Sequence, residues 1–423
     1  MPQVDERCTT DGAGEAPRAP LEGVRVLDLS RILAGPWCGQ LLADFGADVI
    51  KVEKPGGGDD TRSWGPPWLK DGTGADTGES AYYLACNRNK RSVAIDFGRP
   101  GGAALVTRLA RRADVLIENF KVGGLGRYGL DYQALRPVNP RLVYCSITGF
   151  GQTGPYARRT GYDAAIQAMG GLMSITGERD DLPGGGPQKA GVAVADLMAG
   201  MYAAAAILAA LRHRDLCGEG QHLDVALLDT QVAWLANQAS NYLVGGVVPQ
   251  RAGTAHPNIV PYRAFPTADG FLMVAVGNDT QFARFARLTG HPEWAQDPRF
   301  ATNPARVRHR ELLEPLVAAA LAARDTGEWL AAFEAEGVPA APINDLAQVF
   351  ADPQVQARGL RIDAAHPGGR PVAMVRQPVR FSATPPRAPA APPSCGQHTA
   401  EVLAEIGVSG TEFEALRAAG VVD

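Results

Sequence analysis

One acidic residue, Asp196, stands near the start of a long apolar stretch, AGVAVADLMAGMYAAAAILAALRHR, which covers residues 190–214. The spacing of its Ala, Leu, Ile and Met residues predicts a helix from Asp196 onward. An N-cap is the favoured role for such a carboxylate, because it accepts hydrogen bonds from unpaired backbone N–H groups and interacts well with the helix dipole. The same position suits a covalent nucleophile, since small neighbours leave room for a substrate. Asp163, in TGYDAAIQAMGG, presents the same two alternatives.

Two further motifs contain residues that suit anion binding. NRNKRS, at residues 87–92, places three cations and two amides before a predicted strand. A solvated basic turn is the favoured interpretation, and the alternative is a cradle for phosphate or for a carboxylate, which arginine binds at two points. GLGRYG, at residues 124–129, matches the G-x-G-x-x-G pattern of dinucleotide-binding proteins. The acid that would hold the ribose about 20 residues later is lacking, so a nicotinamide site is not favoured.

The composition argues against several classes of partner. The chain has 423 residues, of which 45% are hydrophobic and 20% charged, with a formal net charge of −4 and no block of lysines and arginines. Its apolar runs are shorter than the ~20 residues of a membrane span. The six cysteines are scattered without a C-x-x-C pair, which predicts reduced thiols and no zinc site. We therefore expect a cytoplasmic protein without a metal ion, a nucleic-acid partner or a membrane partner.

Strand and helix patterns alternate through the first half of the chain. Three strand–helix–strand units in succession predict an α/β fold with a doubly wound, Rossmann-like parallel sheet and ligands at the carboxyl ends of the strands. The expected strands are at residues 24–30, 48–53, 92–97, 114–119 and 141–151, and the expected helices are at residues 37–47, 101–113 and 130–140.

The pattern changes after Leu228, which indicates a second domain. A Gly/Pro-rich segment at 245–266 precedes one predicted strand, GFLMVAVGND, and three amphipathic helices, which predict a smaller α+β domain. PRAPAAPPS, at 386–394, is typical of an extended linker. The expected organisation is a disordered tail at 1–20, a large α/β domain at 21–228, a linker and small domain at 229–345, and a return linker with a C-terminal segment that rejoins the large domain at 346–423.

Seven stretches, taken in order, resemble the class III CoA-transferase family, which includes formyl-CoA and carnitine CoA-transferases. The resemblance covers about Leu21 to Asp423. It is carried by GVRVLDLSRILAGP, GADVIKVEKPGGGDDTRSWGPP, NRNKRSVAID, ADVLIENF, NPRLVYCSITGFGQTGP, GYDAAIQAMGGLMSITG and GVAVADLMAGMYAAAAILAAL. Within the family, WGPPW, SAYYLACNRNKRS, NYLVGG, GTAHPNIVPYRAF and GQHT are most similar to the succinyl-CoA:glutarate CoA-transferase branch, which moves CoA between dicarboxylates.

The resemblance implies that Asp196 is a nucleophile. Its carboxylate attacks the thioester of an acyl-CoA, here expected to be succinyl-CoA, so that a mixed anhydride forms and CoA thiolate leaves. The thiolate then attacks the aspartyl carbonyl and gives an aspartyl-CoA thioester, and an acceptor acid such as glutarate reverses these steps. The chemistry uses acyl-CoA and a carboxylic acid as substrates with no tightly bound cofactor. It requires dry surroundings and N–H donors for the oxyanions.

The resemblance also implies the remaining site residues and the assembly. Asp163, Arg31 and Arg88 are expected to position the substrate, with Arg88 paired to the distal carboxylate of a dicarboxylic acyl group. Family members are interlocked homodimers, so the same assembly is implied here. The contacts with CoA are expected from Leu33, Ala34, Lys54, Ile95, Asp96, Phe97, Gly98, Asn119, Phe120, Lys121, Arg127, Thr160, Gly161 and Tyr162.

Departures from the family pattern disfavour some of the reactions that family members catalyse. The formyl-type enzymes have a glycine-rich flap where this chain reads GTAHPNIVPY, and they have a glutamine at the position of Leu33, which disfavours formate/oxalate exchange. Tyr162 stands where the racemase branch has a histidine, so a proton-transfer group is lost. A transferase for another carboxylate (oxalate, formate or a carnitine-like acid) and an α-methylacyl-CoA racemase-type enzyme are the alternatives.

Overall fold

The computed structural model describes residues 18–367 and 370–423, which divide into two compact units. Unit 1 comprises the described residues up to Gly170 together with Ala193–Trp234 and Arg358–Asp423. Unit 2 comprises Gly171–Val192 and Leu235–Ala357. Residues 1–17 of the expected N-terminal tail lie outside the described part of the chain.

The units differ from the expected domains at three places. Residues 171–192 leave the α/β unit and belong to unit 2, although the expected large domain ran without interruption over 21–228. Unit 2 resumes at Leu235, and the chain returns to unit 1 at Arg358, some residues after the expected boundaries. The first return to unit 1 is at Ala193, which is the residue just before the helix that carries Asp196.

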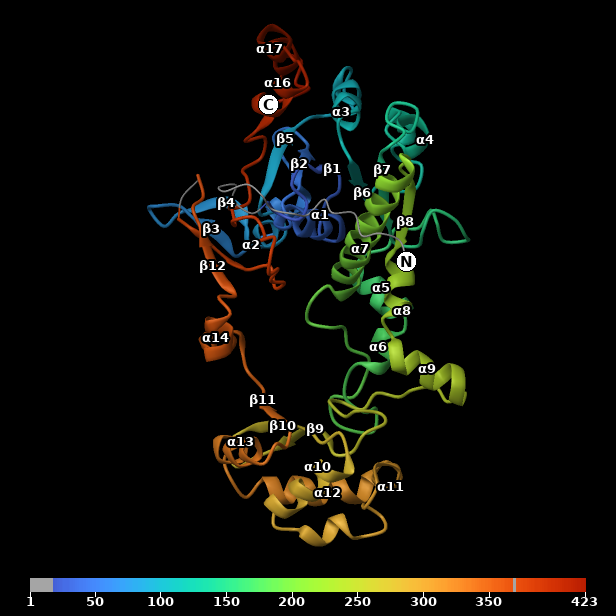
Figure 1. The fold of residues 1–423 in the computed structure, drawn as a ribbon, viewed down its shortest axis with the longest axis vertical. Coiled ribbons are helices and arrows are strands. Elements are labelled where there is room, and N and C mark those ends of the chain that lie inside the picture. The colour runs from blue at the N-terminus through green and yellow to red at the C-terminus, as the bar shows by residue number, and fades with distance from the viewer. Residues whose placement is uncertain (1–17, 368–369) are drawn as a thin grey trace, which may run out of the picture. The chain divides into compact units, whose positions relative to one another are not determined.

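A six-stranded parallel sheet forms the centre of unit 1 (Figure 1), and its strand order is β5-β2-β1-β6-β7-β8. This is the order of the doubly wound folds, in which the chain starts in the middle of the sheet and builds outward twice. The central strand β1 pairs with β2 and β6, so that Leu27 lies opposite both Ile50 and Leu116. The six strands are β1 (Arg25–Asp28), β2 (Asp48–Glu53), β5 (Lys90–Ala94), β6 (Val115–Glu118), β7 (Val143–Thr148) and β8 (His222–Ala226). The expected α/β fold with a parallel sheet is confirmed.

Both faces of this sheet are covered, as the alternation of side chains along each strand requires. Val26 faces a core cluster shared with helices α1 (Ala34–Asp44) and α7 (Val194–Cys217). Leu27 faces the opposite cluster, shared with α3 (Gly102–Ala110) and α16 (Thr399–Glu405). The remaining elements of unit 1 are β3 (Trp68–Lys70), β4 (Asp76–Ser80), α2 (Ala81–Ala85), α4 (Tyr132–Leu135), α5 (Asp163–Met169), α8 (Leu227–Ala233), β12 (Arg361–Ala364), β13 (Val372–Val375) and α17 (Gly410–Ala418).

Helix α7 is, within the described residues, the one helix long and apolar enough to cross a membrane by length and composition alone. The apolar composition of α7 is also that of a helix buried in the core of unit 1. Ala195, Ala199 and Ala203 are fully buried, and small side chains at this spacing let the helix lie close to α1 and the sheet.

Unit 2 has a core of its own, built on a three-stranded antiparallel sheet in the order β11-β10-β9. The expected strand in GFLMVAVGND is β10, and the three expected amphipathic helices are α10, α12 and α13. The elements of unit 2 are α6 (Leu172–Ile175), α9 (Ala236–Gly245), β9 (Tyr262–Pro266), β10 (Phe271–Ala275), α10 (Asp279–Leu288), α11 (Asn303–Arg308), α12 (Arg310–Leu321), α13 (Thr326–Ala335), β11 (Ala340–Pro342), α14 (Leu346–Ala351) and α15 (Pro353–Ala357).

Candidate active site

A cleft of about 780 Å³ opens in unit 1 at the carboxyl ends of the parallel strands. Its walls come from the segments that follow β1, β6 and β7, with Asp196 of α7 among the lining residues. Strands β1 and β6 are neighbours in the sheet, but their following segments lead in opposite directions, so the cleft lies at the topological switch point. The lining residues are Arg31, Ile32, Leu33, Ala34, Asp60, Trp64, Phe97, Asn119, Phe120, Lys121, Val122, Gly124, Arg127, Tyr128, Ile147, Thr148, Gly149, Ala157, Arg159, Thr160, Gly161, Tyr162, Asp196 and Leu227.

Asp196 lies in the first turn of α7 and is not its N-cap. The helix begins at Val194, and its N-cap, Ala193, has no side chain that accepts a hydrogen bond. Asp163, from the start of α5, supplies the missing acceptor: its Oδ1 accepts hydrogen bonds from the backbone N–H of Ala195 at 2.8 Å and of Asp196 at 3.4 Å. The favoured N-cap interpretation of Asp196 is therefore wrong. Its carboxylate is left to face the cleft, because another carboxylate satisfies the helix end.

The neighbouring carboxylate of Asp163 affects the pKa of Asp196. Burial raises the pKa of Asp196 to about 7, and the negative charge of Asp163 contributes in the same direction. The second oxygen of Asp163 accepts a hydrogen bond from Gln167 Nε2 at 2.6 Å, which fixes its orientation. A carboxylate that is costly to ionise in its free site is a strong base and a reactive nucleophile once it is ionised.

Helix α7 approaches α1 closely at Gly200, one turn beyond Asp196. A Cβ atom added at Gly200 would lie 2.6 Å from the carbonyl oxygen of Ala34, which is too short for any real contact. Glycine therefore lets the helix that carries Asp196 rest directly on the segment that lines the cleft.

We expect Gly200→Ala to destabilise unit 1 by about 1–3 kcal/mol, because α1 and α7 must separate to admit the methyl group. The matched control is Gly327→Ala, another helical glycine, around which an added Cβ would meet nothing within 4 Å. That control is expected to be neutral or slightly stabilising. Chemical denaturation of both variants measures the difference, and equal stability would contradict the close packing described here.

Positive charge dominates the walls of the cleft. Four cations, Arg31, Lys121, Arg127 and Arg159, line it against two acids, Asp60 and Asp196. Arg31 pairs with Asp60 at 2.9 Å, whereas the guanidinium of Arg159 lies 3.8 Å from the ring centre of Tyr156. Such a surface suits a ligand that carries several phosphates or carboxylates.

The structure brings most of the expected site residues together. Asp196, Arg31, Leu33, Ala34, Phe97, Asn119, Phe120, Lys121, Arg127, Thr160, Gly161 and Tyr162 all line the cleft. Lys54, Ile95, Asp96 and Gly98 do not line it. Ile95 is fully buried in the core of unit 1, Asp96 accepts a hydrogen bond from the Gly98 amide in a turn, and Lys54 is exposed.

Arg88 is buried and already paired, so the prediction that it binds a substrate carboxylate is wrong. Its Nε and Nη2 donate to the two oxygens of Asp44, and its Nη1 donates to the carbonyl of Val375 at 3.0 Å. Lys90, in the same NRNKRS motif, is equally buried and pairs with Asp28 at 2.9 Å. The motif is therefore neither a solvated turn nor an anion cradle. These two cations neutralise carboxylates inside the protein.

Several aromatic or basic residues at or near the cleft were not identified from the sequence. Trp64 and Arg159 line the cleft, and Tyr82 stacks edge-on against Trp64 with ring centres 5.1 Å apart. Burial raises the pKa of Tyr82 to about 12, and the negative charges of Asp196 and Asp163 contribute in the same direction. The only signal in the sequence was the position of Trp64 and Tyr82 inside the stretches WGPPW and SAYYLACNRNKRS.

Among the described residues, no group of three or more His, Cys, Asp or Glu residues is arranged to hold a metal ion. The five described cysteines are free, and Cys38, Cys86 and Cys145 are buried.

Comparison with known proteins identifies the family to which the chain is similar. The sequence model of CoA-transferase family III matches residues 21–399. The chain is 55% identical over 389 residues to the succinate–glutarate CoA-transferase of Agrobacterium fabrum, covering 92% of this chain and 96% of that protein. It is 44% identical over 405 residues to the succinyl-CoA:glutarate CoA-transferase of Homo sapiens, covering 96% of this chain and 90% of that protein. A crystal structure of a CAIB/BAIF family protein from Brucella suis superposes with a TM-score of 0.81 at 51% identity, covering 92% of this chain and all of that one.

Proposed function

Because the chain belongs to CoA-transferase family III, an enzyme family, we propose that it moves CoA from succinyl-CoA to a dicarboxylic acid such as glutarate through a thioester on Asp196. The observation that carries the proposal is the partly buried carboxylate of Asp196 in a cleft lined with cations at the switch point of the sheet. The relatives named succinate–glutarate and succinyl-CoA:glutarate CoA-transferase supply the substrate class.

Each step of the proposed reaction takes place on residues of the cleft. An oxygen of Asp196 attacks the thioester carbon of succinyl-CoA, and the C–S bond breaks to release CoA thiolate and leave a succinyl-aspartyl anhydride. The thiolate attacks the aspartyl carbonyl, which frees succinate and forms the aspartyl-CoA thioester. Glutarate then attacks the aspartyl carbonyl of that thioester, and the C–S bond breaks to release CoA thiolate and leave a glutaryl-aspartyl anhydride. The thiolate attacks the glutaryl carbonyl, which forms glutaryl-CoA and restores the carboxylate of Asp196. Each tetrahedral oxyanion forms near the N-terminal end of α7, where the helix dipole stabilises negative charge.

The cations of the cleft lie on two different segments, which suit the acyl-CoA and the dicarboxylate respectively. Lys121 and Arg127 follow β6, and we propose that they bind the phosphates of CoA. Arg31 lies on the segment that packs onto α7 through Ala34, and we propose that it pairs with the distal carboxylate of the dicarboxylate, the role that buried Arg88 cannot fill.

The proposed substrates are tested by incubating the enzyme and succinyl-CoA with a panel of mono- and dicarboxylic acids and measuring the acyl-CoA products by mass spectrometry. Glutaryl-CoA among the fastest-formed products supports the proposal, and a preference for monocarboxylates refutes it. Arg31→Met is expected to raise KM for dicarboxylates more than for monocarboxylates. Arg127→Met is the matched control, and it is expected to raise KM for succinyl-CoA with every acceptor.

The pH dependence of the reaction follows from the raised pKa of Asp196. Only the ionised carboxylate attacks, so kcat/KM is expected to fall about tenfold for each pH unit below about 7. Asp163→Asn removes the neighbouring negative charge and is expected to move the acidic fall of kcat/KM to lower pH. Burial still keeps the pKa of Asp196 above its ordinary value. Profiles of kcat/KM between pH 5 and 9 for both proteins test this, and superimposable profiles would contradict the coupling.

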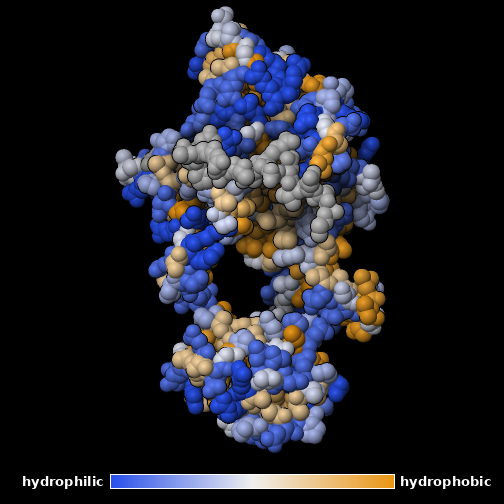
Figure 2. Space-filling model, viewed as in Figure 1, coloured by the Kyte–Doolittle hydropathy of each residue, from blue (hydrophilic) through white to orange (hydrophobic). Residues whose placement is uncertain are grey.

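We further propose a homodimer in the cytoplasm. A run of exposed apolar side chains on and after α9 supports the dimer: Tyr242, Leu243, Val244, Val247 and Val248. Figure 2 shows hydrophobic residues gathered over this helix. The free cysteines fit a reducing compartment. Sedimentation equilibrium of the purified protein tests the assembly.

A further inference from the structure

The segment from the end of β1 to the start of α1 carries four consecutive cleft residues, Arg31 to Ala34, and one of them has an unusual backbone. Ile32 has a φ of 72°, in the left-handed region that β-branched residues almost never occupy. Such a conformation persists only where the surroundings hold it, and it is found preferentially at functional sites. We call residues 30–36, which include the first residues of α1, the cleft loop.

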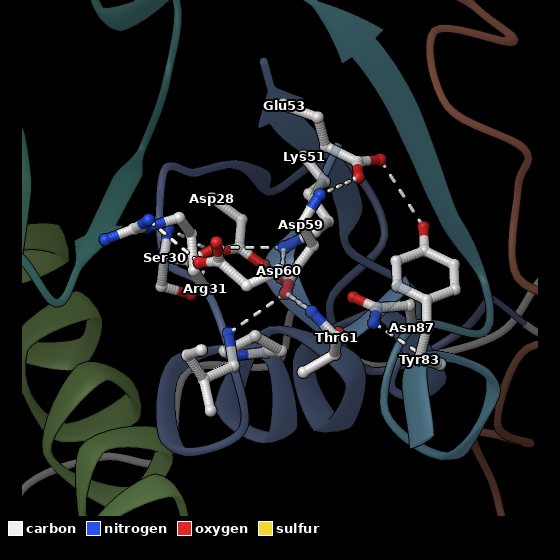
Figure 3. A network of polar contacts seen from close by, with 12 residues as sticks. Asp28, Ser30, Arg31, Lys51, Glu53, Asp59, Asp60, Thr61, Tyr83 and Asn87 are labelled. Carbon is white, nitrogen blue, oxygen red and sulfur yellow. Dashed lines mark hydrogen bonds and ion pairs between the residues drawn. The ribbon is translucent and has the colours of Figure 1, made fainter. Parts of the chain in front are cut away.

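A buried ion pair holds the first half of the cleft loop. Asp59 Oδ1 accepts a hydrogen bond from the backbone N–H of Ile32 at 3.3 Å, and Asp59 Oδ2 pairs with Lys51 Nζ at 2.8 Å. The same ammonium donates to the carbonyl of Ser30 at 2.9 Å. The side chains of Lys51 and Asp59 are fully buried, and Figure 3 shows them pointing toward one another beside the loop.

A second buried pair holds the two ends of the cleft loop. Lys90 Nζ pairs with Asp28 at 2.9 Å and donates to the carbonyl of Pro36 at 2.8 Å, while Asp28 Oδ1 accepts a hydrogen bond from the backbone N–H of Ser30 at 3.0 Å. Each lysine thus binds one loop carbonyl and one carboxylate. The loop closes tightly, since a Cβ atom added at Gly35 would overlap the side chain of Ser30.

The charges around the first pair keep both partners ionised. Burial alone would lower the pKa of Lys51, but the carboxylates of Asp59, Asp28 and Glu53 raise it above its ordinary value. Burial alone would raise the pKa of Asp59, but Lys51 lowers it to about 2, helped by hydrogen bonds from Thr61. A buried ion pair of this kind adds little net stability over apolar residues of similar size. Its contacts with the cleft loop indicate a role in the conformation of that loop.

We propose that Lys51 and Asp59 are positioning residues of the transfer reaction, because together they hold Ile32 in the left-handed conformation that turns Arg31, Leu33 and Ala34 toward the acyl-CoA cleft. Neither residue lines the cleft, so both act through the loop. The inference rests on the proposed function only for the identity of the ligand.

The test is a double-mutant cycle with Asp59→Asn and Ile32→Gly. Asp59→Asn keeps the shape of the side chain, removes the charge that pairs with Lys51, and weakens the acceptor for the Ile32 amide. We expect it to raise the Kd for CoA and to lower kcat/KM for succinyl-CoA, each by about tenfold or more. In the Ile32→Gly background, Asp59→Asn is expected to change the Kd for CoA and kcat/KM by at most about a third of that factor. Glycine adopts positive φ without a steric penalty, so the loop no longer needs Asp59 to hold this conformation.

Two results would overturn the proposal. The first is a lower unfolding temperature of Asp59→Asn together with an unchanged Kd for CoA, because a merely structural ion pair behaves in that way. The second is an equal loss of CoA affinity in both backgrounds. The Kd, measured by calorimetry, does not depend on Asp196 chemistry, so it stays informative even if the enzyme fails to transfer CoA.

A milder variant covers the case in which Asp59→Asn does not fold. Thr61→Val removes the hydroxyl that donates to Asp59 Oδ1 at 2.8 Å and leaves every charge in place. It is expected to weaken CoA binding about threefold, again with a smaller effect in the Ile32→Gly background. No effect of Thr61→Val on CoA affinity would count against the proposal.

Discussion

Replacing Asp196 with alanine is expected to lower kcat for CoA transfer by about a thousandfold or more, because the neighbouring carboxylate of Asp163 is already engaged and cannot take its place as the acyl acceptor. Both oxygens of Asp163 accept hydrogen bonds. Steady-state rates with succinyl-CoA and glutarate measure the loss, with Asp229→Asn, an exposed acid in the first turn of α8, as the control.

The fold of the Asp196→Ala variant is expected to be intact, and its stability provides a second check. The pKa of Asp196 is about 7 in the folded protein and lower in the unfolded chain, so the folded state binds the extra proton. The contribution of this group is therefore fully present at low pH and is lost as pH rises through about 4 to 7. Without the carboxylate, the free energy of unfolding should fall less between pH 5 and pH 8 than it does in the parent. Burial also raises the pKa of Glu118 to about 7, so part of the pH dependence remains in both proteins. An equal fall in the two proteins would contradict the raised pKa of Asp196.

A large loss of stability is expected at Lys90, whose ammonium is fully buried against Asp28. Lys90→Met removes the charge and leaves Asp28 buried without its strongest partner, which is expected to cost about 3–5 kcal/mol. It also releases the carbonyl of Pro36, so the end of the cleft loop is freed. Urea denaturation measures the change in the free energy of unfolding.

A surface pair of the same type is the control. Lys70 pairs with Asp76 at 2.5 Å, with both side chains about half exposed, and Lys70→Met is expected to cost less than about 1 kcal/mol. Combining Lys90→Met with Asp28→Asn removes the uncompensated charge and is expected to recover part of the loss. If Lys90→Met were as harmless as Lys70→Met, the buried pair would not have the structural importance assigned to it.

Local patterns were sufficient to predict most of the α/β unit. The strand DVIKVE, at residues 48–53, has the same bounds in the structure as in the prediction, because its β-branched residues Val49, Ile50 and Val52 favour a strand and pack into the cores on the two faces of the sheet. The sixth strand, His222–Ala226, was not predicted. It is short, and α8 begins directly after it. The turn residues that normally mark the end of a strand are therefore missing from the sequence at this point.

Site residues were predictable where their role follows from a local sequence motif. They were not predictable where their role depends on a contact with a residue far away in the sequence. Asp196 and the residues after β6 lie in the cleft as expected. The role of Arg88 was decided by Asp44, 44 residues earlier in the chain, and no local pattern reveals that pair. The cap on α7 comes from Asp163, and the left-handed backbone of Ile32 is held by a distant acid in the same way. Charges and caps that meet only after folding have no signature in the spacing of residues.

The proposed mechanism requires that Asp196 becomes covalently bonded to CoA during transfer. The direct measurement is to incubate the enzyme with succinyl-CoA, add hydroxylamine, and identify the modified residue by peptide mass spectrometry. A hydroxamate on Asp196, dependent on succinyl-CoA and not formed at any residue of the Asp196→Ala variant, is the predicted result. A modification on another residue, or an unmodified Asp196 in an enzyme that turns over normally, would contradict the mechanism.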